Sequence, residues 1–263
     1  DPSFSNSPSS DYFAMSVLEL DDEKTNEATL VHSYAVAGGD LKDHIKYLHY
    51  LVTNFNIELL IIDNAGYQFI DSANESELFR DSRINLKFFD FNSDKEGAEY
   101  EKMLLAAKHQ YNKKEGAICF KQLFSTSFLR EANEYLQASI DHKRIWFASR
   151  SAACGSFFDK LAAQAVPLKL MPYENKGDLI ESQDDLVYQT KKQCALIEVK
   201  TTAKGTQTFD LPQHLKRSTS ANRARRDNYT TLMLGNWAVK AYNDIKNTKQ
   251  EQINHTFTPR MLG

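Results

Sequence analysis

The order of apolar and polar positions along the chain predicts alternating strands and helices. Residues 12–20 and 28–37 are rich in β-branched and aromatic residues, which is typical of two paired strands. Asp40 has the side chain of a helix N-cap, and it precedes a stretch, 41–55, with apolar residues every three or four positions. We therefore predict two strands followed by an amphipathic helix.

The segment 57–63, IELLIID, is almost continuously apolar. Such a run is typical of a strand that is buried on both faces in the middle of a parallel sheet. It ends at Asp63, and Asn64 to Gly66 form a predicted turn.

The rest of the chain continues the mixture of helices and strands. Helices are predicted around 70–80 and over 97–111, 127–140, 178–193 and 229–246, and strands over 84–91, 117–120, 144–149 and 194–202, with a short extended piece at 209–212. Residues 151–175 show no interpretable pattern. This order predicts an α/β domain with a mixed sheet over residues 1–246, followed by a loose polar tail, 247–263.

Composition excludes several classes of protein. Hydrophobic residues make up 41% of the 263 residues and charged residues 25%, as in ordinary globular proteins. The three cysteines are far apart and form no C-x-x-C pair, which argues against a disulfide framework or a zinc site. No apolar run approaches the ~20 residues of a membrane span, so we expect no membrane partner.

Charge is distributed unevenly, although the net charge is only −3. Residues 1–30 contain seven acids and one base, whereas residues 200–226 contain seven Lys or Arg and one acid, Asp210. A basic segment of this kind can contact nucleic acid, but it can equally be a solvated surface.

Three aspartates stand where elements begin or end: Asp1 before the first loop, Asp63 after the apolar strand, and Asp227 before the last helix. Clustered carboxylates of this kind can hold Mg²⁺ or Mn²⁺ for phosphodiester hydrolysis. Each acid also has a structural interpretation. Asp227 is suited to cap the helix, and Asp63 is suited to start a turn.

The segments around these acids resemble the nuclease domain of phage terminase large subunits. Asp1-Pro2-Ser3 with the serine-rich loop resembles the first acidic motif of that family, and LLIIDNAGYQ (59–68) resembles the second. The third is matched by residues 196–212 followed by RRDNYTTLMLGNWAVKAY (225–242), a helix that begins with an acid and follows a basic stretch. The motifs stand in the family's order.

The resemblance implies a ribonuclease H-like fold, a mixed β-sheet flanked by helices, with Asp1, Asp63 and Asp227 as catalytic metal ligands. It implies a metal-dependent endonuclease that cuts double-stranded viral DNA during genome packaging, using two Mg²⁺ or Mn²⁺ ions.

The implied setting is the cytoplasm of an infected bacterium, with transient attachment to the procapsid portal. The partners in the whole protein are an N-terminal ATPase domain, the portal ring and the small terminase subunit, and the isolated domain is expected to be monomeric. No G-x-x-x-x-G-K-[ST] motif occurs, so the ATPase domain is expected to be absent from these residues.

One departure from the family pattern concerns the third motif, where Arg226-Asp227-Asn228 has a single carboxylate. We therefore expect the second ion to bind weakly without DNA. Asp11 and Asp210 are supplementary ligand candidates, although structural roles are favoured for both. The expected DNA-binding cations precede the third acid: Lys216, Arg217, Arg223, Arg225 and Arg226.

Other functions fit the same residues. The chain could be a transposase-type or junction-resolvase-type nuclease of the same fold, a non-catalytic module that docks on DNA or a portal, or a structural domain whose aspartates are caps and turns. Binding of Mn²⁺ at clustered acids distinguishes a nuclease from the last two classes.

Overall fold

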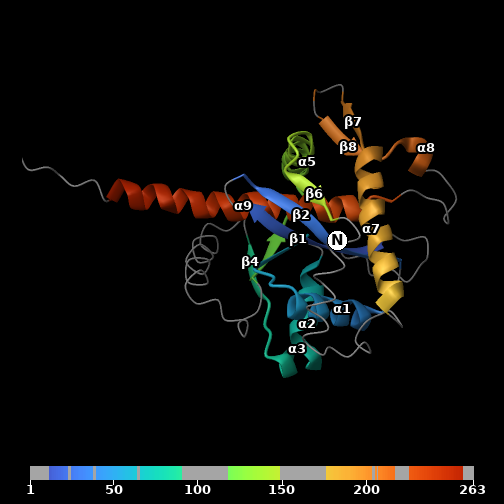
Figure 1. Cartoon of the computed structure of the whole chain (residues 1–263), viewed down its shortest axis with the longest axis vertical. Helices are drawn as coiled ribbons and strands as arrows, with labels where there is room; N and C mark the ends of the chain where they lie inside the picture. Colours follow the sequence, from blue (N-terminus) through green and yellow to red (C-terminus); the bar gives the residue numbers. More distant parts are fainter. Residues whose placement is uncertain are drawn as a thin grey trace, which may run out of the picture.

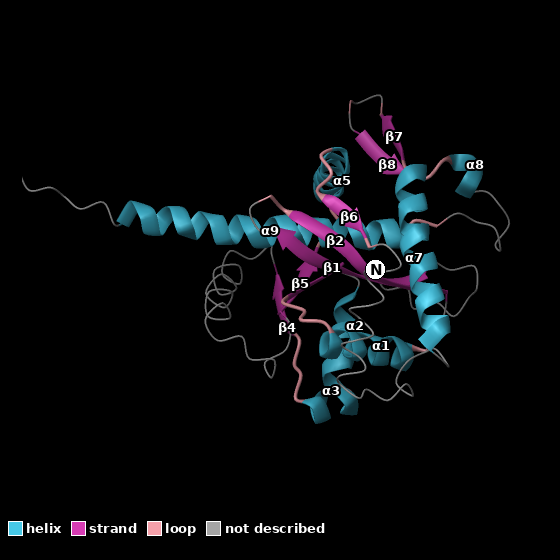
Figure 2. Ribbon diagram, in the orientation of Figure 1, coloured by secondary structure: helices cyan, strands magenta, loops and turns pink. Residues whose placement is uncertain are grey.

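The computed structural model describes residues 12–22, 25–37, 40–63, 66–90, 118–148, 176–202, 205, 207–216 and 225–256. Helices and strands are mixed along this part of the chain, which confirms the predicted α/β class (Figures 1 and 2).

The first sheet is formed by β1 (Tyr12–Asp22), β2 (Glu27–Ala37) and β6 (Ile145–Phe147), with β2 in the middle. β1 and β2 pair, as the sequence predicts, in antiparallel orientation, and β6 is parallel to β2. The register of β1 and β2 shifts between Val17 and Leu18, which is typical of a β-bulge. Among the described residues, β1 is an edge strand of this sheet.

The second sheet is parallel and contains β3 (Leu59–Asp63), β5 (Ile118–Gln122) and β4 (Lys87–Asp90), with β5 in the middle. The apolar segment that ends at Asp63 is indeed a strand. Its predicted central position is wrong for the described residues, because β3 lies at the edge of its sheet and only Ile62 has a buried side chain.

Helices cover these sheets on two sides. One group is α1 (Leu41–Asn54), α2 (Tyr67–Glu75) and α3 (Glu77–Ser82). The other helices are α5 (Thr126–Asp141), α7 (Lys176–Leu196), the short α8 (Gln213–Lys216) and α9 (Asp227–Thr256). The hairpin of β7 (Glu198–Thr201) and β8 (Gln207–Asp210) forms a separate two-stranded sheet.

Two hydrophobic clusters follow from this arrangement. The first packs β1 and β2 against α1, α2 and α3, with Phe13, Leu48 and Ile70 among its buried residues. The second packs β2 and β6 against α5, α7 and α9, with Leu30 and Leu232 in its interior. α9 contacts β1, β2 and β3 as well as α5 and α7, so it packs against both sheets (Figure 1).

Local sequence explains where several of the described helices begin. Asp40 accepts a hydrogen bond from the backbone N–H of Lys42, which confirms its predicted capping role. Ser125 caps α5 in the same way through the N–H of Phe128. The last helix, predicted over 229–246, extends to Thr256 and therefore includes ten residues of the expected tail. The predicted helix over 97–111 lies outside the described residues.

Candidate functional site

Asp63 is the last residue of β3, at the carboxyl end of a parallel strand. Its side chain is half-buried, and Oδ1 accepts a hydrogen bond of 2.8 Å from the backbone N–H of Gly66. This contact matches the turn-forming role that the sequence suggests. Oδ2 has no hydrogen-bond partner among the described residues.

Asp227 begins α9, and only 5% of its surface is exposed. Its Oδ2 accepts a hydrogen bond of 2.9 Å from the backbone N–H of Tyr12, the first residue of β1. The carbonyl of Arg226 accepts from the N–H of Thr230, so Arg226 occupies the cap position. Asp227 lies one residue further into the helix than the N-cap interpretation requires, and its carboxylate binds an amide of a distant strand.

β1 and α9 run side by side in the same direction. The Tyr12–Asp227 hydrogen bond joins their first residues, and the hydroxyls of Ser16 and Thr231 are 2.6 Å apart one turn later. Further along, a Cβ placed on Gly235 would lie 2.6 Å from Leu18 Cδ1, so the two elements are in close contact there.

β3 runs in the opposite direction to β1 and α9. Its amino end lies beside the distal part of α9, because Tyr242 donates a hydrogen bond of 2.5 Å to Oε2 of Glu58. At its carboxyl end, the helix that follows Asp63 brings the ring of Phe69 to 4.9 Å from that of Phe13. Asp63 and Asp227 therefore lie toward the same end of β1, the end at which Tyr12 and Phe13 are located.

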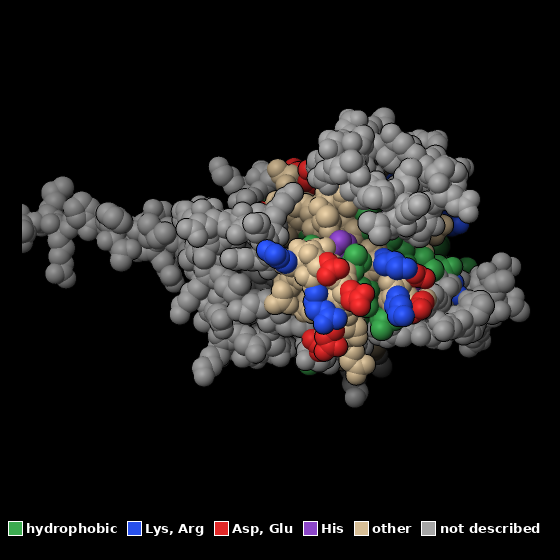
Figure 3. Space-filling view, turned by 90° about the horizontal axis from the view of Figure 1, so that it is seen from below, with side chains coloured by type: hydrophobic (Ala, Val, Ile, Leu, Met, Phe, Trp, Pro, Cys, Tyr) green, Lys and Arg blue, Asp and Glu red, His purple; other side chains and the backbone are tan. Residues whose placement is uncertain are grey.

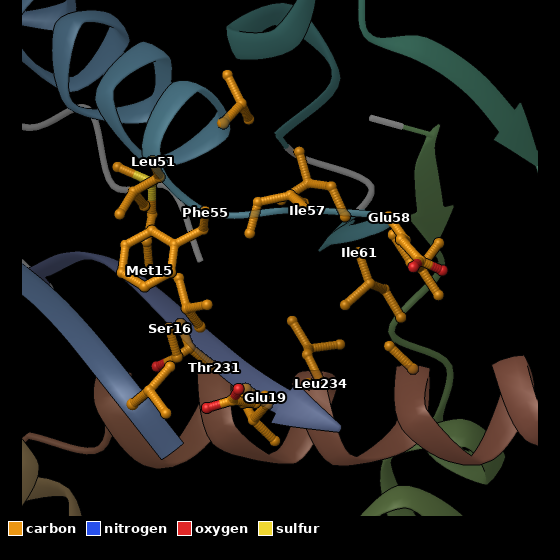
Figure 4. Close-up of a pocket in the computed structure, with 18 of the residues that line it drawn as sticks. Met15, Ser16, Glu19, Leu51, Phe55, Ile57, Glu58, Ile61, Thr231 and Leu234 are labelled. Carbon is orange, nitrogen blue, oxygen red and sulfur yellow. The ribbon is translucent and has the colours of Figure 1, made fainter. Parts of the chain in front are cut away.

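A cavity of about 570 Å³ separates β1 from β3. We call it the β1–β3 groove and define it by ten of its lining residues: Met15, Ser16, Glu19, Leu51, Phe55, Ile57, Glu58, Ile61, Thr231 and Leu234 (Figure 4). The acids Asp63 and Asp227 are not among its lining residues; the neighbouring Ile62 and Phe13 are.

The basic segment makes internal contacts where it is described. Lys216 forms an ion pair with Asp210, and Arg226 Nη1 lies 3.2 Å from Oδ1 of the same carboxylate. Burial favours a higher pKa for Asp210, but the hydrogen bonds from Lys216 and the Leu211 N–H, with the charge of Arg226, lower the pKa overall. Asp210 therefore has the structural role that was favoured for it.

Arg225 lies against Tyr12 rather than in open solvent. Its Cζ is 4.0 Å from the centroid of the Tyr12 ring, within the range of a cation–π contact. Since Tyr12 also donates to Asp227, one residue joins a predicted DNA-binding cation to a predicted metal ligand.

Several predicted site residues lie outside the described residues: Asp1, Asp11, Arg217 and Arg223. Within the described part of the chain, no group of three or more His, Cys, Asp or Glu side chains is arranged to hold a metal ion.

Two residues near the acids were not singled out from sequence. Tyr12 is the link just described, and Gln122 is the register partner of Asp63 on β5, with 7% of its surface exposed. The sequence signal available for Gln122 was its polar side chain at the end of an apolar strand. No local signal marks Tyr12, because its partner is 215 residues away.

Figure 3 shows the molecule from below the view of Figure 1, and the described part of this face carries both positive and negative side chains. Acidic and basic side chains alternate over its described part (Figure 3). The described part of this surface is therefore not uniformly basic.

Comparisons with protein-family models, with curated proteins and with solved structures give no match to this chain. None of the described helices is both long enough and apolar enough to cross a lipid bilayer.

Proposed function

We propose that this chain is a divalent-metal-dependent DNA endonuclease domain of ribonuclease H-like fold, of the kind found in phage terminase large subunits. The observation that carries the proposal is that Asp63 and Asp227, from distant parts of the sequence, lie toward the same end of β1. The third acid of the proposed site is Asp1, which precedes β1 in the chain.

The topology supports this assignment. The elements occur in the order expected from the resemblance: an antiparallel pair, a helix, a strand that ends at an acid, and a long final helix that begins with an acid. Ligands in open α/β sheets gather at the carboxyl ends of parallel strands, and Asp63 has that position.

The donors suit Mg²⁺ or Mn²⁺. Both ions prefer oxygen ligands, and Mg²⁺ commonly uses only one or two carboxylates in addition to water and substrate phosphate. Asp63 provides an oxygen that no described residue occupies, and Asp227 is anchored by Tyr12. A single carboxylate at residue 227 agrees with a second ion that binds weakly before DNA arrives.

The residues of the chain have distinct roles in the proposed reaction. Asp63 and Asp227 would hold the metal, and the Gly66 and Tyr12 N–H groups restrict the rotation of the two carboxylates. A bound ion would lower the pKa of coordinated water and offset charge on the scissile phosphate. Arg225 and Arg226 are adjacent to the acid in sequence and would bind flanking phosphates, which orients the duplex without reading its bases.

The setting follows the same resemblance. The substrate is double-stranded viral DNA, cut during packaging in the cytoplasm of an infected bacterium, with temporary attachment to the procapsid portal. The proposed partners are an ATPase domain in the same protein, the portal ring and the small terminase subunit.

Plasmid cleavage together with thermal melting tests the proposal. We expect nicking that requires Mn²⁺ or Mg²⁺ and stops with a chelator, and a Tm that rises with Mn²⁺. Asp63→Asn should reduce cleavage by roughly 100-fold or more and remove the Mn²⁺ effect on Tm. The matched control is Asp141→Asn, at the exposed carboxyl end of α5. If the parent neither cuts nor gains stability with Mn²⁺, or if both variants behave like the parent, the site is not catalytic.

A further inference from the structure

Asp210 is the single acid in the basic segment 200–226, and two cations of that segment share its carboxylate. Lys216 Nζ donates to Oδ2 of Asp210, and Arg226 Nη1 lies 3.2 Å from Oδ1. These residues come from the end of β8, the end of α8 and the position before α9. We call the three side chains the Asp210 cluster. One carboxylate for two cations leaves a positive charge that is not compensated.

The ion pairs of the Asp210 cluster are accessible from solvent. Between 32% and 47% of the surface of each of the three side chains is exposed. Exposed ion pairs contribute little to stability, because water screens the charges and the side chains lose freedom when they pair. Another anion that reaches this surface can therefore replace the carboxylate without a large loss of stability.

Both cations keep donors that Asp210 does not use. Among the described residues, the guanidinium of Arg226 has hydrogen-bond partners only at Nη1, which donates to the carbonyl of Phe209 and to Asp210. Nη2 and Nε are left over, and the ammonium of Lys216 has three hydrogens. A planar set of N–H donors beside an ammonium suits the oxygens of a phosphate group.

The Asp210 cluster is connected to the proposed metal site at the start of α9. Arg226 precedes Asp227 in the chain, and the carbonyl of Phe209 holds its side chain at 3.1 Å independently of Asp210. On the same short segment, Arg225 lies against the ring of Tyr12, whose N–H binds Asp227. Two arginines are therefore fixed next to a proposed metal ligand, and one of them is paired with an acid.

We propose that the Asp210 carboxylate occupies a binding site for a backbone phosphate of duplex DNA and competes with that phosphate. In the free protein, Asp210 neutralises part of the charge of Lys216 and Arg226. In the complex, a phosphate oxygen replaces the carboxylate on one or both cations, while the hydrogen bond from Arg226 to Phe209 remains. The inference rests on the proposed function for the identity of its ligand, but it concerns binding and not cleavage.

A different role for Asp210 makes the opposite prediction. If the carboxylate served only to orient Lys216 and Arg226 for DNA, removal of its charge would loosen both side chains and weaken binding. If it competes with phosphate, removal of its charge frees both cations and strengthens binding. The direction of the change in affinity therefore distinguishes the two roles.

Asp210→Asn tests the proposal, because asparagine keeps an oxygen that can accept from the Leu211 N–H and from Arg226 but has no charge. Fluorescence anisotropy measures the binding of the complete chain to a short labelled duplex in EDTA, which prevents metal-dependent cleavage. We expect Asp210→Asn to bind roughly two- to fivefold more tightly, the strength of an exposed ion pair, with a steeper dependence on salt. Asp210→Ser, which also removes the charge, should change the affinity in the same direction.

Two controls separate competition at this site from a general effect of charge. Asp141→Asn removes an exposed acid at the end of α5 and should change the affinity by less than about twofold, because salt screens distant exposed charges. In a chain that also carries Lys216→Ala and Arg226→Ala, Asp210→Asn should lose most of its effect, since the cations that it frees are absent.

Four results would overturn the proposal: equal or weaker binding by both Asp210 variants, an equal gain for Asp141→Asn, a full gain in the chain without Lys216 and Arg226, or no duplex binding by any of these proteins. The proposed nuclease activity is judged separately. A chain that does not cleave DNA but shows the expected gain in binding would contradict the nuclease and leave this inference in place, and cleavage without any gain would do the reverse.

Discussion

The backbone N–H of Tyr12 donates a hydrogen bond to Oδ2 of Asp227, although 215 residues separate the two along the chain. The same tyrosine ring lies under the guanidinium of Arg225. The first strand and the last helix are thus joined at their first residues. This carboxylate has a structural partner and is also a proposed metal ligand, and substitutions can separate the two roles.

Asp227→Ala should reduce both stability and cleavage, whereas Asp227→Asn should reduce cleavage alone. Alanine leaves the partly buried N–H of Tyr12 without its acceptor, which costs about 1–2 kcal/mol of unfolding free energy. Asparagine keeps an oxygen acceptor but removes the charge that a metal needs. Urea denaturation and plasmid nicking, measured on both variants, check this. Equal stability loss in both would show that the charge itself is structural.

Lys216→Ala and Arg226→Ala should weaken binding to all duplex sequences about equally. Each removes one cation that is proposed to bind phosphate, so the slope of log K against log salt concentration should fall by about 1 per substitution. Arg130→Ala on α5, an exposed arginine near Glu131 and Glu134, is the control. Fluorescence anisotropy over a salt series measures the slopes. A loss limited to one DNA sequence would show base recognition instead.

Acid should destabilise the fold through His32. Burial lowers the pKa of His32 to about 3, and its Nε2 lies 2.6 Å from the Tyr47 hydroxyl. In the unfolded chain the ring accepts a proton near its ordinary pKa of 6.5, whereas the folded ring stays neutral. The free energy of unfolding should therefore fall as pH drops from about 6.5 toward 3, by up to about 1.4 kcal/mol per pH unit.

His32→Gln should flatten this dependence, because glutamine can still form a hydrogen bond with Tyr47 and does not titrate. Urea denaturation between about pH 7 and pH 4.5 covers the window before most carboxylates protonate. His49, whose pKa burial also lowers, leaves a smaller slope of the same sign in the variant. An unchanged slope would assign the acid sensitivity to other groups.

Gly235→Ala should change stability little, because two effects oppose each other. Alanine in a helix is favoured over glycine by about 1 kcal/mol, but its Cβ would meet Leu18 Cδ1 at 2.6 Å and force that side chain to move. Gly235→Leu should cost about 1–3 kcal/mol, since its larger side chain must displace Leu18 further than the alanine Cβ does.

Combining Gly235→Ala with Leu18→Ala tests whether the two residues are in contact. The double variant should lose less stability than the sum of the single variants, by about 0.5 kcal/mol or more. Denaturation of all four chains gives this coupling. Strict additivity would contradict the close approach of α9 to β1.

Local patterns in the sequence predict this fold where the determining contacts are themselves local. The helix predicted over 41–55 is found at 41–54 with Asp40 as its cap, because both the cap and the apolar stripe are encoded within one segment. The hairpin of β1 and β2 is predicted for the same reason.

Predictions that depend on distant partners are less successful. The apolar run 59–62 correctly indicates a strand but not its edge position, which depends on which strand lies beside it. Asp227 has the sequence of a helix cap, yet its carboxylate binds Tyr12, and no local pattern encodes that partner. The three acids were predicted to meet, and the described residues bring Asp63 and Asp227 toward one end of β1, whereas Asp1 lies outside them.

The position of α9 against β1 also has a consequence for biosynthesis. β1 leaves the ribosome before the segment that contains Thr231 and Gly235, which pack against it, and 215 residues separate Ser16 from Thr231. While the residues between them are translated, β1 and β3 lack the helix that covers them. Contacts of such long sequence separation form slowly, and uncovered strand edges promote aggregation. We expect the native core to form only after translation has reached α9, and a nascent chain stalled before residue 227 should depend on chaperones to remain in solution.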